Sequence, residues 1–563
     1  MAAPSLTGRF IRMILIPILA TTIAVIWFAE RSIAQLGLAL AAYGVFTTLL
    51  LIVTADIERA LLLASLLVIA TTLASLVKYS HSGLKLIVTD LPLLFAGTTP
   101  FFFTQYPLAV AGVAAGTVVL FAAATATVLG IDGEALPLAA RLTLLCAASI
   151  CLMVAWAAGG GNAPFQLIAA ERRCFFSAFI ASLLDARSWV KFGGLDFSDI
   201  AHEPLPLMDA VPGRIADFPD IIVIQHESIF DPRLYGLPVD PAIDAFLSPP
   251  DGWHGRLNVD IFGGGSWQSE FSVLTGLSSA SFGSSAYYLF KRGVGRFRNS
   301  LPDALTALGY KTALASSCRR SFLNYDQFYA AVGMSERIFT DDLPPPFDLA
   351  RFETTHSDAQ FLPAAIATHM AGISDGAAPR FLYALTNFNH GPHNRRLTSP
   401  GQSDDARAFA HASLAVPHYA EYYARLEETA ATWKQVRHEL SAHQRPTLIV
   451  HYGDHQPVMI RRIEAKLKLP PDPRRQFRTF YAVEALNFEP GRFRAGRGAD
   501  LDIAFLGTVA LQLAGLPLDR IFATRASLID QCGDGYFASV SERKRRFHRT
   551  LVDLGAINLA EPS

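Results

Sequence analysis

Long uncharged stretches dominate roughly the first 160 residues of the chain. The following runs contain no Asp, Glu, Lys or Arg: 13–29, 32–55, 60–77, 91–131 and 142–170. A helix that crosses a bilayer needs about 20 mainly apolar residues, within a range of about 17–25. A buried helix of a soluble protein explains one such run, but five in succession predict a bundle of membrane-spanning helices. Because further apolar runs follow the first directly, a cleaved signal peptide is disfavoured.

We expect about five spans, one in each of the first three runs, one at 107–129 and one in the last run. The ambiguous segment is Leu86–Thr104, which carries Asp90, a costly residue in lipid, and two prolines. We interpret this segment as interfacial or re-entrant, and a sixth span is the alternative. In the five-span arrangement the cytoplasmic side has a weak excess of basic residues, namely Arg9, Arg12, Arg59 and Arg141.

The composition changes after the last apolar run, and 563 residues predict at least two domains. We divide the chain into a transmembrane domain at 1–158, a connection at 159–217, an α/β domain at 218–540 and a C-terminal tail at 541–563. Phe165–Trp189 predicts an amphipathic helix, which packs either on the soluble domain or in the headgroup layer. Prolines then mark a linker at Pro204, Pro206 and Pro212.

From Phe218 onward, short apolar runs of strand type alternate with helical stretches. This alternation favours an α/β domain with a mostly parallel central sheet and right-handed crossovers. Leu501–Leu516 predicts a late helix, and the charged run Glu542–Arg549 predicts a solvated face or tail. The expected helices include Ser300–Leu308, Ala359–Met370 and Val416–Ser441.

Polar residues follow three of the strand-like runs. Glu227, His390 and the pair Asp454-His455 each come shortly after a run of mainly apolar residues. In an open α/β sheet, functional groups collect at the carboxyl ends of the strands. We therefore expect these four side chains to converge on one edge of the sheet.

Ser266 follows three glycines and precedes Trp267–Thr275, a stretch that can begin a helix. Its hydroxyl then lies at the positive end of a helix, where anions are favoured. An ordinary N-cap serine is the alternative, although the position three residues later is Ser269 and not the Glu or Gln of a capping box.

Glu227, Ser266, Asp454 and His455 form the predicted ligand set of a divalent metal. Three oxygens and one imidazole suit Mn²⁺ or Mg²⁺ better than a thiolate-binding metal; we favour Mn²⁺, and Zn²⁺ also fits. Such an ion lowers the pKa of the serine hydroxyl and acts as a Lewis acid on a phosphoryl oxygen. His390 is suited to contact that oxygen or to protonate a leaving alkoxide.

Three residues that follow His390 are suited to hold an anionic group, although a solvated loop explains them as well: His393, Arg395 and Arg396.

The chain as a whole has no basic field, because 48 Lys and Arg are balanced by 49 Asp and Glu, so we expect no nucleic-acid partner. Cys318 and Cys532 lie in the soluble part and can bridge in an oxidising compartment, but their spacing does not indicate a bridge.

Five segments of the chain match a known family: Ile224–Ser228, Gly265–Phe271, Leu301–Thr312, Asn389–Pro392 and Tyr452–His455. They resemble the lipoteichoic acid synthase-like branch of the alkaline phosphatase/sulfatase superfamily. The resemblance covers roughly residues 218–520, in the family's order and below a five-span anchor. It implies an enzyme of the cytoplasmic (inner) membrane with its catalytic domain on the periplasmic side. Such an enzyme transfers phosphoglycerol from phosphatidylglycerol to a glycan or lipid-glycan through a covalent intermediate.

The resemblance assigns metal binding to the ligand set above, makes Ser266 the nucleophile and makes His390 a substrate contact. Arg320 falls where the family has residues that contact the headgroup. Two departures matter: Ser266 replaces the family's usual threonine, and glycines replace the residues before it, which changes the fit to the headgroup.

Other functions remain as alternatives to phosphoglycerol transfer. They are phosphoethanolamine transfer to lipid A or another saccharide, a phosphodiesterase that uses water as acceptor, and a non-enzymatic binding or transport protein. The region around Ser266 has no C/S-x-P-x-R motif, which disfavours sulfate-ester hydrolysis. All four ligand positions are intact, which disfavours the non-enzymatic alternative.

Overall fold

A computed structural model of the chain divides it into two compact units, Met1–Val190 and Lys191–Ser563. We refer to them, after the roles expected from the sequence, as the membrane unit and the catalytic unit. The residues that the structure describes are 6–30, 32–82, 85–88, 90–91, 107–130, 135–160, 173–185, 203–214, 217–320, 322–343, 356–371, 378–398, 401–536 and 542–560.

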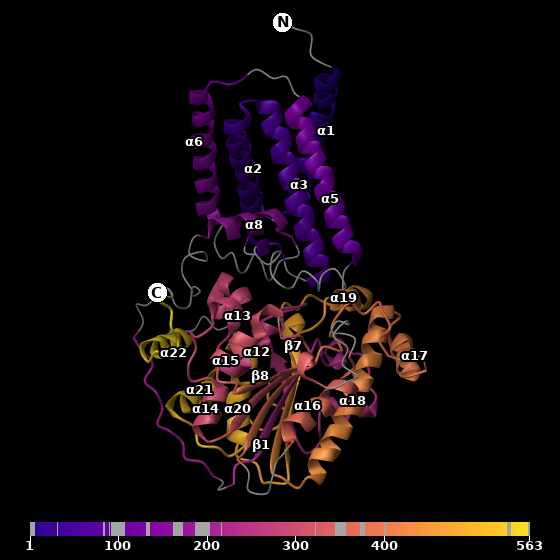
Figure 1. Ribbon diagram of the computed structural model, residues 1–563, viewed down its shortest axis with the longest axis vertical. Coiled ribbons are helices and arrows are strands. Elements are labelled where there is room, and N and C mark those ends of the chain that lie inside the picture. Colours follow the sequence, from indigo (N-terminus) through magenta and orange to yellow (C-terminus); the bar gives the residue numbers. More distant parts are fainter. Residues whose placement is uncertain are drawn as a thin grey trace. The chain divides into compact units, whose positions relative to one another are not determined.

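The membrane unit is built from long apolar helices that run side by side (Figure 1). Helix α2 packs against both α3 and α6, and α3 also packs against α1 and α5. Three helical stretches of the described residues are long and apolar enough to cross a membrane: Ile33–Thr54, Ile57–Ser80 and Leu138–Ala158. The predicted N-terminal helical bundle is therefore confirmed, with three of its spans meeting that criterion. The helix bounds are α1 (Leu6–Ala29), α2 (Ile33–Thr54), α3 (Ile57–Ser82), α5 (Pro107–Gly130), α6 (Leu138–Ala155) and a π-helical turn at Trp156–Gly160.

Two acidic side chains of the membrane unit, Glu30 and Asp90, accept hydrogen bonds within it. The Asp90 carboxylate accepts a hydrogen bond from Lys78 Nζ at 2.7 Å. Most of the predicted re-entrant segment, residues 92–104, lies outside the described residues. The predicted amphipathic helix is described only as α8 (Phe175–Leu184), and Glu30 accepts hydrogen bonds from the first backbone N–H groups of that helix. Residues 161–172 and 186–190 of this region lie outside the described residues.

The catalytic unit contains an eight-stranded sheet with the order β4-β3-β5-β1-β6-β7-β2-β8. Strand β7 pairs antiparallel with both of its neighbours, and every other pairing within the sheet is parallel. The predicted mostly parallel sheet is therefore confirmed. The strand bounds are β1 (Asp220–His226), β2 (Trp253–Asn258), β3 (Lys311–Ser316), β4 (Glu336–Phe339), β5 (Arg380–Leu385), β6 (Thr447–Gly453), β7 (Arg478–Leu486) and β8 (Leu501–Asp502).

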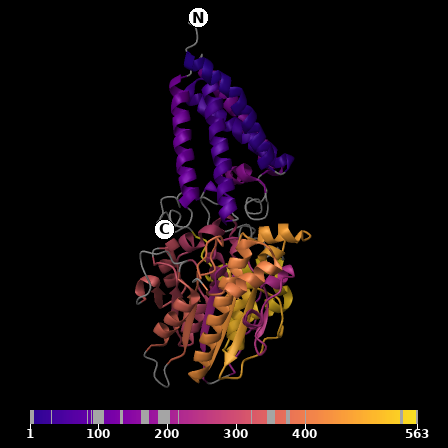
Figure 2. The same ribbon diagram turned by 90° about the vertical axis from the view of Figure 1, so that its right-hand side faces the viewer.

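Helices cover both faces of the sheet (Figures 1 and 2), because its strands are apolar on both sides. In β1, Ile221 and Val223 belong to one buried cluster and Ile222 and Ile224 to another, as the alternation of side chains along a strand requires. The first face packs on α12 (Trp267–Thr275), α13 (Leu289–Arg292), α14 (Leu301–Ala307), α15 (Tyr325–Ala331), α20 (Leu506–Leu513), α21 (Arg520–Cys532) and α22 (Glu542–Asp553). The second packs on α11 (Pro241–Leu247), α16 (Asp358–Met370), α17 (Asp404–Ser413), α18 (Pro417–Ala442) and α19 (Ile460–Leu467).

The C-terminal charged run, expected to form a solvated face or tail, is helix α22. Its Phe547 and Leu551 side chains are buried in the first cluster, whereas Arg549 on the same helix is part exposed. The predicted late helix begins as strand β8 at Leu501–Asp502 and becomes helical after it. The linker residue Val211 forms an antiparallel bridge with Leu518, so this part of the linker lies along the catalytic unit.

Candidate active site

Neighbouring parallel strands bring two of the predicted metal ligands together. In the β1–β6 pair His226 lies opposite Gly453, so Glu227 and Asp454 directly follow the ends of adjacent strands. A Cβ on Gly453 would collide with the backbone carbonyl of Ile229. Glycine at this position therefore lets the chain that leaves β1 pass close over the end of β6.

Glu227, Asp454 and His455 form a buried cluster at this edge of the sheet. Each offers one ligand atom, and these atoms all lie within 4.8 Å of one another. His455 Nε2 is 3.2 Å from Glu227 Oε1 and 3.7 Å from Asp454 Oδ2. The structure thus places three of the four predicted ligands at distances that one ion can bridge.

Backbone groups orient these side chains. Asp454 Oδ1 accepts hydrogen bonds from the N–H groups of Ser228 and His455, both at 2.7 Å. Asp454 Oδ2 is buried and has no hydrogen-bond partner. His455 Nδ1 donates to the Gln456 carbonyl at 3.2 Å, which leaves Nε2 pointing at the two carboxylates.

Ser266, the fourth predicted ligand, lies beside this cluster. Its hydroxyl donates to Glu227 Oε2 at 2.8 Å, and the Oγ atom is 3.4 Å from His455 Nε2. The three glycines before it have φ values of +81°, +150° and +94°, which residues with side chains rarely adopt. The close approach of Ser266 to the cluster therefore depends on glycine at these positions. Ser269 Oγ donates to the Asp454 carbonyl at 2.7 Å and thereby fastens the start of α12 to the end of β6.

Burial and charge shift the pKa values of the cluster in opposite directions. Burial raises the pKa of Asp454 to about 7, and the charge of Glu227 contributes to this rise. Burial also opposes ionisation of Glu227, but the charges of His455 and His390 hold its pKa below the usual range. Burial disfavours protonated His455, yet the two carboxylates raise its pKa to about 9.

The donor set fits a divalent cation. Both Glu227 and Asp454 interact with the protonated imidazole of His455, and Asp454 Oδ2 is buried without a hydrogen-bond partner. A buried acceptor that lacks a partner is costly, and a bound cation removes that cost. Carboxylate, hydroxyl and imidazole ligands together suit Mn²⁺, Mg²⁺ or Zn²⁺.

His390 lies in the loop after β5, which pairs in parallel with β1, so this loop leaves the same edge of the sheet as Glu227. It is half-buried in the loop after β5, and its Nδ1 donates to the Gly391 carbonyl at 2.6 Å. His393 is buried inside the same loop, where its Nε2 donates to the Asn389 carbonyl at 2.9 Å. Burial, followed by the charge of Arg425, lowers the pKa of His393, so the neutral imidazole supports the loop.

The predicted anion-binding arginines lie in ion pairs or at the surface. Arg320 pairs with Asp326 at 2.8 Å and with Asp342 at 2.6 Å. Arg396 pairs with Asp404 at 2.5 Å, and the Arg395 side chain is exposed. In the structure, Arg320 and Arg396 thus pair with carboxylates outside the buried cluster, and Arg395 faces solvent.

The residues of this site lie within the range matched by a known protein family. A family model described as Sulfatase matches residues 219–510, which include both carboxylates, Ser266 and His390. The chain belongs to the sulfatase family. This assignment confirms the alkaline phosphatase/sulfatase superfamily predicted from the motifs.

Individual relatives are distant. An uncharacterised protein of Haemophilus influenzae is 24% identical over 338 residues, which are 58% of this chain and 58% of that protein. The capsular polysaccharide biosynthesis protein RkpI of Rhizobium meliloti is 28% identical over 266 residues, which are 46% of this chain and 43% of that protein. The chain thus spans about half of the length of these curated relatives.

One solved structure is similar over both units. It is the integral membrane lipooligosaccharide phosphoethanolamine transferase A (EptA) of Neisseria meningitidis, with a TM-score of 0.52 and 10% identity. The similarity covers 87% of this chain and 98% of that chain. At this identity the likeness shows a shared fold.

Beneath the cluster of this sulfatase-family site lies a polar network that sequence reasoning missed. Gln225 Nε2 donates to Glu270 at 3.2 Å, and Gln225 Oε1 accepts from Tyr383 at 3.0 Å and from Tyr452 at 2.5 Å. Burial raises the pKa of Glu270 to about 8, so its side chain is neutral near pH 7. Gln225 and the strand tyrosines interrupt otherwise apolar strands, and this pattern was a signal that could have identified them.

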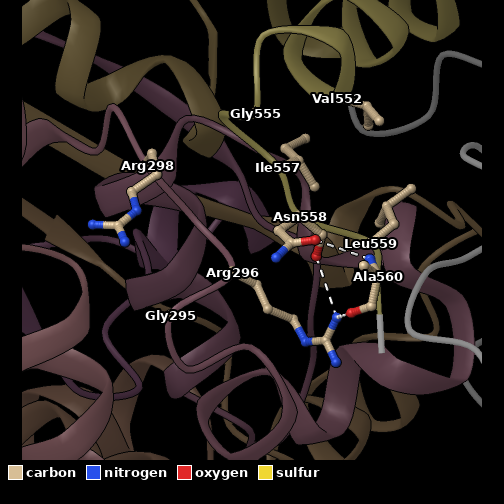
Figure 3. Close-up of a pocket in the computed structure, with 9 residues that line it drawn as sticks. All are labelled: Gly295, Arg296, Arg298, Val552, Gly555, Ile557, Asn558, Leu559 and Ala560. Carbon is tan, nitrogen blue, oxygen red and sulfur yellow. Dashed lines mark hydrogen bonds between the residues drawn. The ribbon is translucent and has the colours of Figure 1, made fainter. Parts of the chain in front are cut away.

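A pocket with a different lining lies between residues 295–298 and the C-terminal segment (Figure 3). Arg296 points from the loop toward the backbone carbonyls of Asn558 and Ala560 and donates to both. The bridge between Phe297 and Ile557 lies beside these contacts. None of the residues that line this pocket belongs to the predicted site. We therefore interpret the Arg296 contacts as structural contacts that hold the C-terminal segment in place.

Proposed function

We propose that the chain is a membrane-anchored, metal-dependent phosphoglycerol transferase. It moves glycerol phosphate from phosphatidylglycerol to a periplasmic or cell-surface glycan through a phospho-Ser266 intermediate. The observation that carries this proposal is the Ser266 hydroxyl, held 2.8 Å from Glu227 beside three buried metal-type ligands. A hydroxyl in such a place is suited to nucleophilic attack on phosphorus.

Glu227, Asp454 and His455, together with the Ser266 oxygen, would hold the metal, and Mn²⁺ is the ion that we propose. When bound, such an ion stabilises the serine alkoxide and the charge on the phosphoryl oxygens. The protein contributes a preorganised site, because backbone N–H groups fix Asp454 and the Gln456 carbonyl fixes His455.

In the first half-reaction the Ser266 Oγ atom attacks the donor phosphorus. The hydroxyl releases its proton to solvent, since Ser266 is part exposed. The bond between phosphorus and the diacylglycerol oxygen breaks, and protonated His390 gives its proton to that leaving oxygen. The products are diacylglycerol and phosphoglycerol bound to Ser266.

In the second half-reaction neutral His390 accepts the proton of an acceptor hydroxyl. The acceptor oxygen attacks phosphorus, and the bond to Ser266 Oγ breaks, which restores the serine after it regains a proton. Helix α12 begins at Trp267, directly after the nucleophile, so its N-terminal end favours the negative charge that develops in both steps.

Two comparisons guide the substrates that we propose. RkpI is named for capsular polysaccharide biosynthesis, which supports a polysaccharide acceptor. EptA is named for phosphoethanolamine transfer, which makes phosphatidylethanolamine the alternative donor. We place the chain in the cytoplasmic membrane with its catalytic unit on the periplasmic side, where such acceptors occur.

The donor is identified by diacylglycerol release. The purified full-length chain is incubated with Mn²⁺ and vesicles that contain either phosphatidylglycerol or phosphatidylethanolamine, each labelled in its headgroup. We expect diacylglycerol from phosphatidylglycerol vesicles and label on an added glycan. Release only from phosphatidylethanolamine selects the alternative donor, free glycerol phosphate without glycan labelling indicates a phosphodiesterase, and no release from either lipid contradicts the proposal.

A further inference from the structure

The loop that carries His390 is folded around one buried guanidinium. Arg425 on α18 has an exposed fraction of 0%, which is rare for arginine. Its donors reach three backbone carbonyls of the loop, those of Phe388 at 3.3 Å, His390 at 3.0 Å and Arg395 at 2.7 Å. The guanidinium therefore joins backbone positions spread over eight residues of the loop.

Two more side chains of α18 hold the same loop. Glu421, Arg425 and Thr429 are spaced by four residues and so share one face of the helix. Glu421 Oε1 accepts from Arg425 Nε and from the Leu397 N–H, both at 3.0 Å. Thr429 Oγ1 accepts from Asn389 Nδ2 at 2.9 Å. This face of α18 thus contacts the loop near its start, in its middle and at its end.

These contacts leave the metal ligands to other elements. Glu227 and Asp454 follow β1 and β6, and Ser266 precedes α12, whereas the hydrogen bonds of Arg425 go to the loop and to Glu421. Removal of the guanidinium should therefore disturb the His390 backbone and leave the three-residue cluster in place.

We propose that Arg425 is a positioning residue, which places the imidazole of His390 against the Ser266 centre by holding the His390 carbonyl. This inference rests on the proposed function and extends it to a residue that does not touch substrate. A guanidinium that bonds the backbone of a reacting residue limits how far its side chain can move. A displacement of about 1 Å at a reacting group can reduce a rate by roughly 10²-fold.

The test is a double-mutant cycle on the full-length chain, read as diacylglycerol release with Mn²⁺ and the donor that the wild type uses. R425M replaces the guanidinium with an apolar chain, and H390A removes the side chain that Arg425 places. If Arg425 acts through His390, R425M lowers kcat roughly 10²-fold in the wild-type background and less than about twofold in the H390A background. Equal losses in both backgrounds, or no loss in the wild-type background, overturn the inference.

A matched control comes from Arg296, a second buried arginine whose donors reach backbone carbonyls, there of the C-terminal segment (Figure 3). R296M should have the same effect on kcat with or without His390. If R425M does not fold, the same cycle is run with R425K, which keeps the charge but replaces the planar guanidinium fork with a single nitrogen. The same pair of outcomes then decides the inference.

Trypsin provides a readout that does not depend on turnover. Loosening the loop exposes the peptide bonds after Arg395 and Arg396, so R425M should be cleaved there faster than the wild type, at unchanged metal content. Unchanged cleavage counts against the proposed role of Arg425 in holding the loop. A wild type that releases no diacylglycerol refutes the proposed function, whereas an active wild type with additive R425M and H390A effects refutes only the role of Arg425.

Discussion

Asp454 divides its two carboxylate oxygens between two tasks. Oδ1 accepts two backbone N–H groups at 2.7 Å, whereas Oδ2 is buried without a hydrogen-bond partner. The first oxygen joins the backbone after β6 to the backbone after β1, and the second is available to a cation. A single residue thus links the local backbone structure to the proposed metal chemistry.

This division can be tested with two substitutions. D454N keeps an oxygen for the two N–H groups but loses the charge, so we expect loss of Mn²⁺ binding with a small loss of stability. D454A loses both and leaves two buried N–H groups unpaired, at a further cost of about 1–3 kcal/mol each. Metal analysis and thermal unfolding of both variants test this prediction, and full Mn²⁺ occupancy in D454N would contradict the ligand assignment.

Asp358 gives the catalytic unit a stability that depends on pH. It is buried and accepts a hydrogen bond from Thr429, and burial, together with the charge of Glu428, raises its pKa to about 7 from an ordinary 3.8. Between these values the folded state keeps a proton that the unfolded state has lost. Stability contributed by this group is therefore complete below pH 4 and is lost as the pH rises to about 7.

The D358N variant has no such titration. From pH 4 to pH 7 the wild type should lose unfolding free energy relative to D358N. We expect a loss of a few kcal/mol, which is the order of magnitude implied by the pKa shift of Asp358. Well above pH 7 the difference should level off. Chemical unfolding of both full-length chains over this range measures it, and a difference that is constant with pH would show that Asp358 ionises normally.

At the scale of the elements, the sequence predicted that functional residues converge at the strand ends, but it did not predict that β7 runs antiparallel to its neighbours. Glu227 and Asp454 each follow a short apolar run, and parallel pairing alone is enough to bring them together. The antiparallel direction of β7 depends on its pairing with β6 and β2, which lie far from it in sequence. Local patterns carry no information on such a pairing.

The same limit applies to Arg425 and Glu270. Both sit in helical segments where charged residues are usually exposed, and their burial comes from loops and strands that fold over them. Ser266, in contrast, stood out because three glycines precede a helix start. Residues with local signals could therefore be proposed from the sequence, and residues whose surroundings come from distant contacts were missed.

Helix α22 shows how a charged segment can still belong to a core. Phe547 and Leu551 are at most 1% exposed, while charged residues cover the other face. We expect F547A to destabilise the catalytic unit by about 3–5 kcal/mol, because it opens a cavity in a packed cluster. R549A on the exposed side, which breaks only the pair with Asp553, should change stability by about 0.5 kcal/mol or less. Thermal unfolding compares the two, and equal effects would contradict the packing of α22.

At the scale of the whole molecule, the two units have separate cores. Both buried clusters that flank the sheet consist of residues from the catalytic unit, so this unit has a hydrophobic core of its own. In the proposed function, the membrane unit holds the chain in the bilayer that contains the donor. Anchoring raises the effective concentration of a lipid substrate without any new contact.

Removal of residues 1–202 separates anchoring from chemistry. We expect the remaining chain to bind Mn²⁺ normally and to react with a short-chain, water-soluble phosphatidylglycerol about as fast as the full-length chain. Its rate with phosphatidylglycerol vesicles should fall roughly tenfold or more. Assays of both chains on both donors measure this, and an equal loss on both donors would mean that the membrane unit also shapes the active site.

The most direct test of the account is the chemical state of Ser266 during turnover. The full-length chain is incubated with Mn²⁺ and phosphatidylglycerol labelled at phosphorus, without acceptor, quenched in acid and mapped by peptide. The account predicts label on the peptide that contains Ser266, also in the control S269A, and none in S266A. Label that persists in S266A, or a wild type that consumes donor without label on Ser266, would contradict it.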